Sequence, residues 1–395
     1  MLTGKMIRLK PTPEQEKLFW KSAGTARWAY NYFLSENERI YREYLENGET
    51  GKKSVSEGEV RKYISNVLKK TTHKWLSEVG SNVPKQAVKD ADKAKKDYLQ
   101  GLRGKPHYKS KHKSKISFYV NYESLSRKNG GFHGEKIGYV RTAEPLPKLP
   151  KGKKYSNPRI SFDGKYWYLS IAYEVSESSC KLTDKSIGID LGVKDLAICS
   201  NGKTYKNINK SKKVRKLKKK LKREQRKVSR KLESNTESYK IIKGYRHPVY
   251  SRPLSECKNF QKQQKKIKLL HRKLANIRNN YLHQTTTEIV KTKPSRIVME
   301  TLNVKGMMKN KHLAGAIQEQ KFYEFKRQVS YKCQKYGIAL VEVPTFYPSS
   351  KTCSCCGCIK RDLKLSDRIY RCNECGLVID RDFNASLNLA NYQSA

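Results

Sequence analysis

Two cysteine pairs near the C-terminus constrain the fold of this chain more than any other feature. Cys353-x-x-Cys356 and Cys372-x-x-Cys375 are each followed by a glycine, and 15 residues separate the two pairs. Two thiolates three positions apart can hold one ion, and the glycine permits the tight backbone turn that this requires. The separation is typical of four-cysteine ribbons. The sequence therefore predicts one structural Zn²⁺ held by these four thiolates, with no coordination position left for water.

The same cluster contains two more cysteines, so that it holds six of the ten in the chain. Cys355 and Cys358 form a competing Cys-x-x-Cys pair, but Ile359 rather than glycine follows them, and we expect them to be bystanders. Clustered cysteines in a basic chain without an apolar leader are typical of an intracellular metal site rather than a disulfide framework. We therefore expect a cytoplasmic protein. Because no run of 18 apolar residues is present, we expect no transmembrane helix and no membrane partner.

The net charge narrows the class of partner. The 395 residues include 85 Lys and Arg against 36 Asp and Glu, which gives a formal charge of +49, and 36% of the residues are hydrophobic. So positive a field points to a polyanion, while the apolar content is sufficient for real hydrophobic cores. We expect a nucleic-acid-binding, multidomain protein of the α+β class.

The N-terminal third is predicted to be a strand followed by helices. Residues 1–10 alternate enough to form a short strand. Two amphipathic helices with Gly24 between them are expected next, and further helices are expected within residues 60–68 and 85–102. Residues 11–114 should thus form a helical domain.

The following segment is expected to be rich in β-structure. Residues 115–182 contain a hairpin whose turn is Asp163-Gly164. After this turn, Trp167, Leu169 and Ile171 share one face of a strand. This alternation predicts a small β-barrel or sheet domain.

The most basic segment is predicted to form two antiparallel helices. Residues 210–232 hold 14 Lys and Arg and one acid, Glu224, yet their apolar residues keep spacings of 3, 4, 7 and 4. A second helix in heptad register follows a loop rich in Ser, Asn and Pro, so residues 210–282 should form a helical hairpin. A charge run usually marks a solvated helix face, but 14 like charges on one helix repel unless a polyanion neutralises them. We expect nucleic-acid contacts from Lys212, Lys216, Lys219 and Lys220.

Three acids lie where predicted elements end or begin. Asp190 and Glu300 each end an apolar strand, and Asp382 begins the helix that follows the cysteine cluster. Phosphodiester hydrolysis with two Mg²⁺ ions needs carboxylates from separate elements that hold the ions about 3.5–4 Å apart. Each acid alone is equally compatible with a capping or surface role. Asp380, two residues before Asp382, is the acid most easily mistaken for a ligand.

The order of these motifs resembles the TnpB family. Its members are RNA-guided RuvC nucleases encoded by insertion-sequence transposons and are related to miniature type V CRISPR effectors. The resemblance rests on residues 188–192 (Gly-Ile-Asp-Leu-Gly), 297–304 (Ile-Val-Met-Glu-Thr-Leu-Asn-Val) and 380–385 (Asp-Arg-Asp-Phe-Asn-Ala), together with the cysteine cluster. Shorter matches extend it over nearly the whole chain, at residues 8–12, 30–33, 104–106 and 349–353.

The resemblance implies a domain order, a site and partners. Residues 1–10 and 115–182 would form a WED-like β-barrel, 11–114 a REC-like recognition domain, 183–346 and 380–395 an RNase H-like RuvC domain with hairpin 210–282 inserted, and 347–379 the zinc ribbon. Catalysis would fall to Asp190, Glu300 and Asp382 with two Mg²⁺ ions. The implied partners are a guide RNA and a target double-stranded DNA that carries an adjacent short motif.

The sequence departs from the family pattern in one helix and after one acid. The family usually has Asp at the position of Asn280 and Lys at that of Gln284, and Thr301 replaces a commoner acid. These changes leave the three acids intact. In the same helix, Arg278 is a candidate nucleic-acid contact, with helix packing as the alternative, and the same alternatives apply to His283.

Three other functions are compatible with parts of the sequence. A CRISPR-associated miniature type V effector would share every motif. A nuclease-inactive, RNA-guided DNA-binding repressor would share the basic surface, but the intact acids argue against it. A strand-transfer transposase is disfavoured because neither a tyrosine nucleophile motif nor a pair of histidines stands out.

Overall fold

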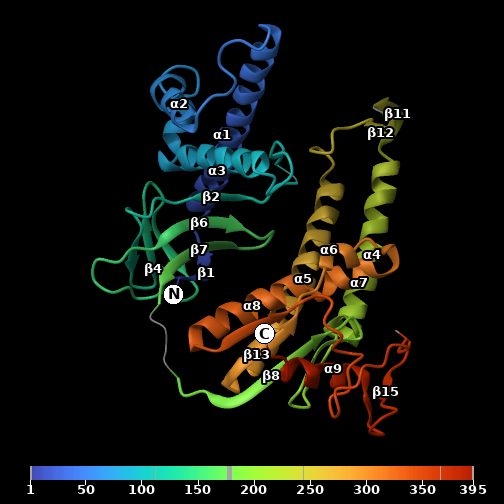
Figure 1. Ribbon diagram of the computed structural model, residues 1–395. Helices are drawn as coiled ribbons and strands as arrows, with labels where there is room; N and C mark the ends of the chain where they lie inside the picture. Colours follow the sequence, from blue (N-terminus) through green and yellow to red (C-terminus); the bar gives the residue numbers. More distant parts are fainter. Residues whose placement is uncertain (1, 112, 176–179, 243, 365, 394–395) are drawn as a thin grey trace. The chain divides into compact units, whose positions relative to one another are not determined.

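The computed structural model describes residues 2–111, 113–175, 180–242, 244–364 and 366–393 (Figure 1). Its contacts divide the chain into an N-terminal unit, Leu2–Val175, and a C-terminal unit, Ser176–Ala395. Of the ranges predicted above, the following residues lie outside the described part of the chain: residue 1 of 1–10, residue 112 of 11–114, residues 176–179 of 115–182, residue 243 of 210–282, residue 365 of 347–379 and residues 394–395 of 380–395. No described helix is both long and apolar enough to cross a membrane.

The first helix of the N-terminal unit, α1 (Pro13–Glu46), is continuous. The expectation of two helices divided at Gly24 is therefore wrong. Glycine costs a helix about 1 kcal/mol relative to alanine, and this cost is outweighed by a stripe of buried side chains on both sides of it, among them Phe19 and Phe33. A capping box fixes the start of the helix, since the Thr12 hydroxyl accepts a hydrogen bond from the Gln15 backbone N–H and the Gln15 side chain accepts one in return.

The remaining helices of this unit lie close to their predicted positions. Helix α2 (Glu57–Tyr63) continues into a short π-helix, η1 (Ile64–Leu68), and a 3₁₀ turn, η2 (Lys74–Glu78), precedes α3 (Asn82–Leu99). The helices expected within 60–68 and 85–102 are thus confirmed, with ends that differ by a few residues.

A seven-stranded antiparallel sheet completes the N-terminal unit, in the order β2-β6-β7-β1-β5-β4-β3. The predicted face of the β7 strand is confirmed, because Trp167, Leu169 and Ile171 are all buried. The first strand of the chain lies inside the sheet, where it pairs with β7 on one side and β5 on the other. The strands are β1 (Leu2–Lys10), β2 (Ser117–Tyr119), β3 (Ser126–Lys128), β4 (Gly131–Gly134), β5 (Gly138–Thr142), β6 (Ser156–Phe162) and β7 (Trp167–Glu174).

The C-terminal unit is built on a mixed five-stranded sheet, in the order β10-β9-β8-β13-β14. The three strands β8, β13 and β14 run parallel, and β9 and β10 are antiparallel additions at one edge. The strands are β8 (Thr183–Leu191), β9 (Asp195–Cys199), β10 (Thr204–Lys206), β13 (Pro294–Glu300) and β14 (Ala339–Val343).

Helices cover both faces of this sheet. Helices α5 (Lys258–Lys291) and α8 (Phe322–Tyr336) pack on the face that carries Ile187 and Ile189. Helix α9 (Arg381–Ala390) packs on the opposite face, where Leu389 contacts Val298. Alternate residues of β8 and β13 therefore point towards α9.

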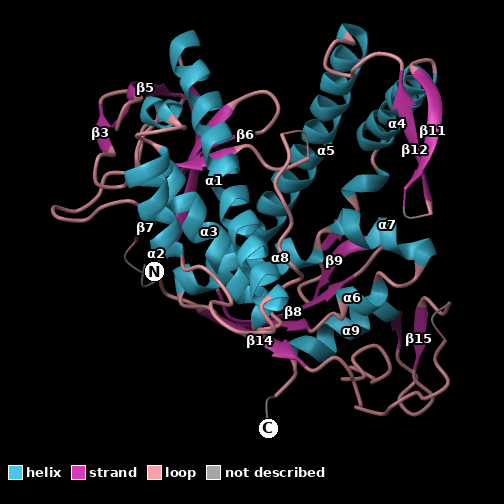
Figure 2. Cartoon of the chain, turned by 90° about the horizontal axis from the view of Figure 1, so that it is seen from above, coloured by secondary structure: helices cyan, strands magenta, loops and turns pink. Residues whose placement is uncertain are grey.

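The predicted helical hairpin is present, but its connection is not the expected loop. Helix α4 (Lys212–Glu233) pairs with α5, and the segment between them forms a two-stranded ribbon, β11 (Thr236–Ile242) and β12 (Tyr245–Tyr250), at the end of the hairpin (Figures 1 and 2). Its Ser, Asn and Pro residues suggested an irregular loop, yet Pro248 is tolerated because β12 is an edge strand. Short elements that were not anticipated include η3 (Ile208–Lys210), α6 (Val304–Met307) and α7 (Lys311–Gln320).

Candidate functional site

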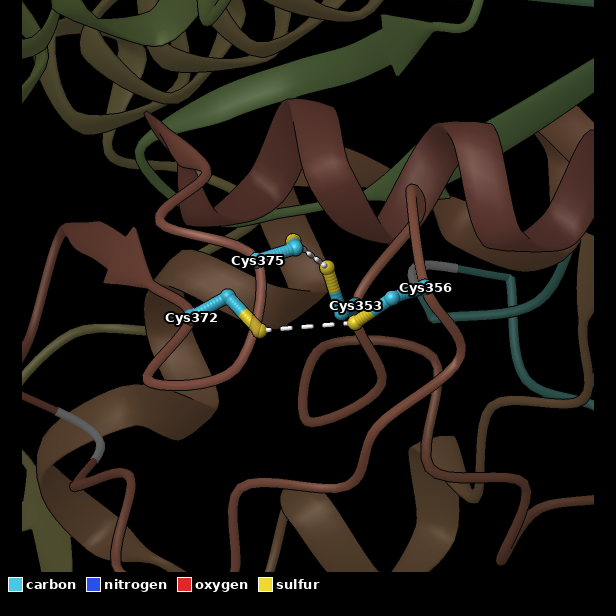
Figure 3. Close-up of side chains that lie close together, drawn as sticks. All are labelled: Cys353, Cys356, Cys372 and Cys375. Atoms are coloured by element: carbon cyan, nitrogen blue, oxygen red, sulfur yellow. Dashed lines mark hydrogen bonds between the residues drawn. The ribbon is translucent and has the colours of Figure 1, made fainter.

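The four cysteines of the two matched pairs converge on one point, between two short strands, β15 (Ile369–Arg371) and β16 (Val378–Asp380), and the preceding loop (Figure 3). The sulfur atoms of Cys353 and Cys375 lie 3.6 Å apart and those of Cys356 and Cys372 3.5 Å apart, and all four lie within 4.8 Å of one another. Tetrahedral coordination with Zn–S bonds of about 2.3 Å separates the sulfurs by about 3.8 Å. The arrangement therefore fits a four-thiolate metal site.

The thiol of Cys372 is already prepared for a metal by its surroundings. Backbone N–H groups, that of Cys375 first, lower its pKa to about 6, so that the thiolate is favoured near neutral pH. Cys355 and Cys358 are exposed and do not belong to the converging group, which agrees with their prediction as bystanders. All cysteines of the described chain are free of disulfides.

Two asparagines of α9 fasten this helix to the cysteine cluster. The Asn384 side chain donates to the carbonyl oxygen of Thr352 (2.7 Å) and accepts from the backbone N–H of Ser354 (3.0 Å). The Asn388 side chain donates to the carbonyl oxygens of Thr352 (2.6 Å) and Ser349 (2.7 Å). Sequence analysis did not identify this clamp. The position of α9 thus depends on the loop that carries the first cysteine pair.

Asp190 and Glu300 lie at the ends of neighbouring parallel strands. In the register of β8 and β13, Ile189 lies beside Met299, which puts the next residues, the two acids, side by side. Asp190 is two residues beyond Gly188, whose α-carbon faces α9, so its side chain lies on the α9 face of the sheet.

Helix α9 brings Asp382 to the same height along the strands as Asp190 and Glu300. Ser386 of this helix lies against Gly188, and Asp382 is one helical turn before Ser386. Four residues of helix rise about 6 Å, and the two residues of strand from Gly188 to Asp190 rise about 6.6 Å. The structure thereby brings together all three acids that sequence analysis singled out.

Electrostatics agrees with this placement. The pKa of Asp190 lies well above its usual range because the surrounding protein removes water from the carboxyl, and because the charges of Glu300 and Asp382 oppose its ionisation. Burial also raises the pKa of Glu300. A cluster of acids that resist ionisation in a partly covered site is typical of a functional site.

The third acid is held by an arginine. The Arg381 guanidinium donates to the Asp382 carboxylate through Nε (3.2 Å) and Nη2 (3.1 Å), and this positive charge also favours ionisation of Asp190. Asp380 has a different role, since its carboxylate accepts from the backbone N–H groups of Asp382 and Phe383 (both 3.0 Å) and caps α9. Among the described residues, the cysteines are the one group of potential metal ligands gathered within 4.8 Å, so the three carboxylates do not all lie that close to one another.

The basic hairpin exposes its charges as the sequence suggested. The side chains of α4 predicted to bind nucleic acid, those of Lys212, Lys216, Lys219 and Lys220, are all exposed. Val214 and Val228 are buried, and Glu224 is buried against α5, where its carboxylate accepts from the Gln263 side chain. The helix therefore presents a cationic surface on one side and packs on the other.

Arg278 is engaged in packing, whereas the side chain of His283 is exposed. Arg278 donates to Asn209 Oδ1 (2.7 Å) and pairs with Glu319 (3.0 Å), so its guanidinium links α5 to η3 and α7. The backbone oxygen of His283 accepts from the buried Lys332 ammonium of α8 (3.0 Å). These contacts support the helix-packing alternative for Arg278, and both alternatives stay open for the exposed side chain of His283.

Three family models match separate parts of the chain. The models are described as “Helix-turn-helix domain” (residues 1–46), “Probable transposase” (170–311) and “Cas12f1-like, TNB domain” (322–389). In this chain the first of these segments is a strand followed by one uninterrupted helix.

Full-length relatives carry related names. A protein of Streptomyces pristinaespiralis, named by inference an RNA-guided DNA endonuclease, is 29% identical over 388 residues, which cover 97% of this chain and 87% of the relative. InsQ of Escherichia coli K12, named in the same way, is 28% identical over 399 residues (97% and 90%). A TnpB-like protein of Acanthamoeba polyphaga mimivirus is 24% identical over 402 residues (98% and 72%). Over nearly its whole length, the chain is therefore similar to proteins that carry RNA-guided DNA endonuclease and TnpB-like names.

The fold of this chain is also similar to that of a protein in a solved complex. A chain in the structure of a Cas12f1–sgRNA–target DNA complex matches it with a TM-score of 0.55 and 14% identity, over 99% of both chains. At this identity the likeness establishes a shared α+β fold.

Proposed function

We propose that this protein is an RNA-guided, metal-dependent endonuclease of the TnpB family that cleaves target DNA. One observation carries the proposal: Asp190 and Glu300 lie side by side on parallel strands, and α9 brings Asp382 to the same level of the same face. The names of the relatives support the guide RNA and the DNA substrate. The match to the transposase model supports an origin in a mobile element.

The acids have the donor chemistry that Mg²⁺ prefers. Carboxylate oxygens suit this hard cation, and the three side chains come from two strands and a helix. Their mutual repulsion, seen in the raised pKa of Asp190, is the repulsion that cations between them would remove. When bound, two Mg²⁺ ions would supply an activated water and positive charge at the leaving oxygen.

The chain's own residues position the reacting groups. Asp190 and Glu300 are fixed by the sheet, so their carboxylates form the rigid half of the site. Asp382 completes the site from the helix, and both of its hydrogen bonds from Arg381 go to one carboxylate oxygen, Oδ1. The exposed lysines of α4 would hold the phosphate backbone of the nucleic acid, because contacts of this kind provide affinity without reading sequence.

The four-cysteine site would hold one structural Zn²⁺. The sulfur distances fit tetrahedral coordination, and four thiolates leave no open position for chemistry. The zinc would act on catalysis only through the asparagine clamp that fixes α9.

Asp190→Ala tests the site. We expect loss of DNA cleavage with RNA and target affinity retained, since one ligand is removed and the basic surface is untouched. The assay uses the RNA that copurifies with the wild-type protein, a DNA duplex matching its guide segment, and Mg²⁺. Metal-dependent cleavage by this variant at the wild-type rate would refute the assignment.

The same assay separates the alternatives. A nuclease-inactive, RNA-guided repressor would bind its target without cutting it in the wild-type form, although all three acids are present. A CRISPR-associated effector would copurify with an RNA that contains repeat-derived sequence, whereas a transposon-encoded nuclease would carry RNA from the end of its own element.

A further inference from the structure

The ribbon at the end of the basic hairpin leaves unusually large apolar side chains in solvent. Ile241 is 76% exposed, Tyr245 74% and Ile242 52%. The ribbon strands pair only with each other, in a sheet of two (Figures 1 and 2). An isolated two-stranded hairpin is marginally stable in water. Contact with a partner would therefore stabilise these side chains relative to exposure to solvent.

Both faces of the ribbon combine apolar and cationic groups. Residues directly opposite each other in an antiparallel pair share a face. Ile241 lies opposite Arg246, and Ile242 lies opposite Tyr245. On the first face the guanidinium of Arg246 also lies over the ring of Tyr239, 4.4 Å from its centroid. The second face adds Lys240 and His247, which also lie opposite each other.

The base of the ribbon is firmly attached to the hairpin. The Asn235 backbone oxygen accepts from the Ser251 N–H (2.9 Å), and the Asn235 side chain donates to the carbonyl oxygen of Arg252 (2.8 Å). These bonds close the base of the ribbon, and the Thr236 hydroxyl donates to the carbonyl oxygen of Leu232 (2.8 Å), which ties the ribbon to the end of α4.

We propose that the β11–β12 ribbon is a base-stacking element that binds unpaired nucleotides of the guide RNA. The charge of the ribbon suits a polyanion, because residues 236–250 contain one acid, Glu237, against three Lys and Arg. Large apolar and aromatic side chains beside cations are the groups on which unstacked bases pack. The inference rests on the proposed function, which supplies the RNA.

RNA rather than DNA is the occupant that these features favour. The interior of a duplex offers no base faces, whereas loops and bulges of a structured RNA do. The lysine surface of α4, continuous with the ribbon along the chain, would hold the phosphates of the same RNA.

The experiment compares two double variants, one for each face of the ribbon. Tyr239→Thr with Ile241→Thr alters the first face, and Ile242→Thr with Tyr245→Thr alters the second. Threonine keeps the β-propensity of the strands. Affinities for the copurifying RNA, transcribed in vitro, and for single-stranded DNA of the same sequence are measured in separate titrations at several salt concentrations without Mg²⁺, and self-association of each variant is measured without nucleic acid.

The expected result is a loss of RNA affinity of about fivefold to a hundredfold for at least one face. The dependence on salt should not change, because stacked bases release no counterions. If the second face is the one that binds, Tyr245→Phe should retain the affinity, since it keeps the ring. Leu102→Thr is the matched control, because Leu102 is 70% exposed outside the ribbon, and it should bind RNA as the wild type does.

Four results would overturn the proposal: unchanged affinity for both faces, a loss accompanied by a shallower salt dependence, a loss restricted to single-stranded DNA, or altered self-association at unchanged RNA affinity. The last would make a second copy of this chain the occupant. Failure of the wild-type protein to bind any RNA would instead refute the proposed function itself.

Discussion

Replacing Gly188 by alanine tests the geometry of the site without altering a charged residue. A Cβ atom at this position would lie 2.0 Å from the carbonyl oxygen of Ser386 and 2.4 Å from the backbone nitrogen of Ala390. Both atoms belong to the backbone of α9, so neither can rotate away. To restore an ordinary 3.4 Å contact, the helix must retreat by about 1.4 Å (3.4 minus 2.0 Å).

A retreat of this size breaks two hydrogen bonds. Ser186 Oγ (2.7 Å) and Arg296 Nη2 (2.9 Å) both donate to the carbonyl oxygen of Ala390. Their loss costs about 2 kcal/mol, and the overpacked contact costs about 1–3 kcal/mol. A total of about 3–5 kcal/mol lowers the Tm of a unit of this size by roughly 6–20 °C. Because Asp382 moves with the helix by more than 1 Å, cleavage should fall by about 100-fold.

Thermal unfolding and single-turnover cleavage measure the two effects. RNA affinity should stay at the wild-type value, since the basic hairpin is untouched. Gly315→Ala is the matched control: Gly315 lies within α7, nothing surrounds its Cβ position within 4 Å, and the change should stabilise the protein by about 0.5–1 kcal/mol. Wild-type Tm and cleavage for Gly188→Ala would show that α9 does not pack on β8 as described.

Four further predictions concern the acids, the cysteine cluster and the basic hairpin. Asp382→Asn should abolish cleavage, whereas Asp380→Asn should cut DNA nearly as the wild type does because asparagine also caps helices; equal rates in the cleavage assay would contradict this. Cys372→Ser, or zinc chelation, should lower the Tm and displace α9, and fully active protein without stoichiometric zinc by elemental analysis would exclude the role. Asp190→Asn should raise the Tm of metal-free protein near pH 8, and this gain should shrink towards pH 4. The reason is that folding raises the pKa of Asp190, and a group of this kind loses its stabilising contribution as the pH rises. A Tm gain that is the same at both pH values would contradict this prediction. The last variant replaces four exposed lysines of α4 by Gln: Lys212, Lys216, Lys219 and Lys220. It should bind RNA more weakly and with a flatter salt dependence. An unchanged salt dependence would mean that these side chains face solvent in the complex.

Patterns with a strong physical origin were readable from the sequence. The spacing of the cysteines, the apolar strands that end in Asp190 and Glu300, and the heptad register of the basic hairpin each reflect a local rule. The structure confirms these strands, the hairpin and the convergence of the four cysteines. The division into recognition, β-barrel and nuclease domains stays a prediction.

Other features depend on contacts between distant residues or lack a periodic signal. Gly24 suggested a break, but the packing of α1 on both sides of it outweighs the local cost. The β11–β12 ribbon escaped notice because neither of its faces is buried, so no alternation of apolar and polar residues marks it. The pairing of Arg381 with Asp382 is a side-chain geometry that no spacing rule encodes.

The Asp-Arg-Asp-Phe-Asn motif shows how closely unlike functions can be packed in one short segment. Asp380 caps the helix, Arg381 pairs with the acid beside it, the charge of Asp382 opposes ionisation of Asp190, and Asn384 fastens the helix to Thr352. The cap fixes where the helix begins and the clamp fixes what it packs against, which leaves the central acid for the proposed cleavage chemistry. This division explains why one of two acids separated by a single residue should be essential and the other replaceable. It also explains why a metal site built from cysteines should govern a reaction in which no cysteine takes part.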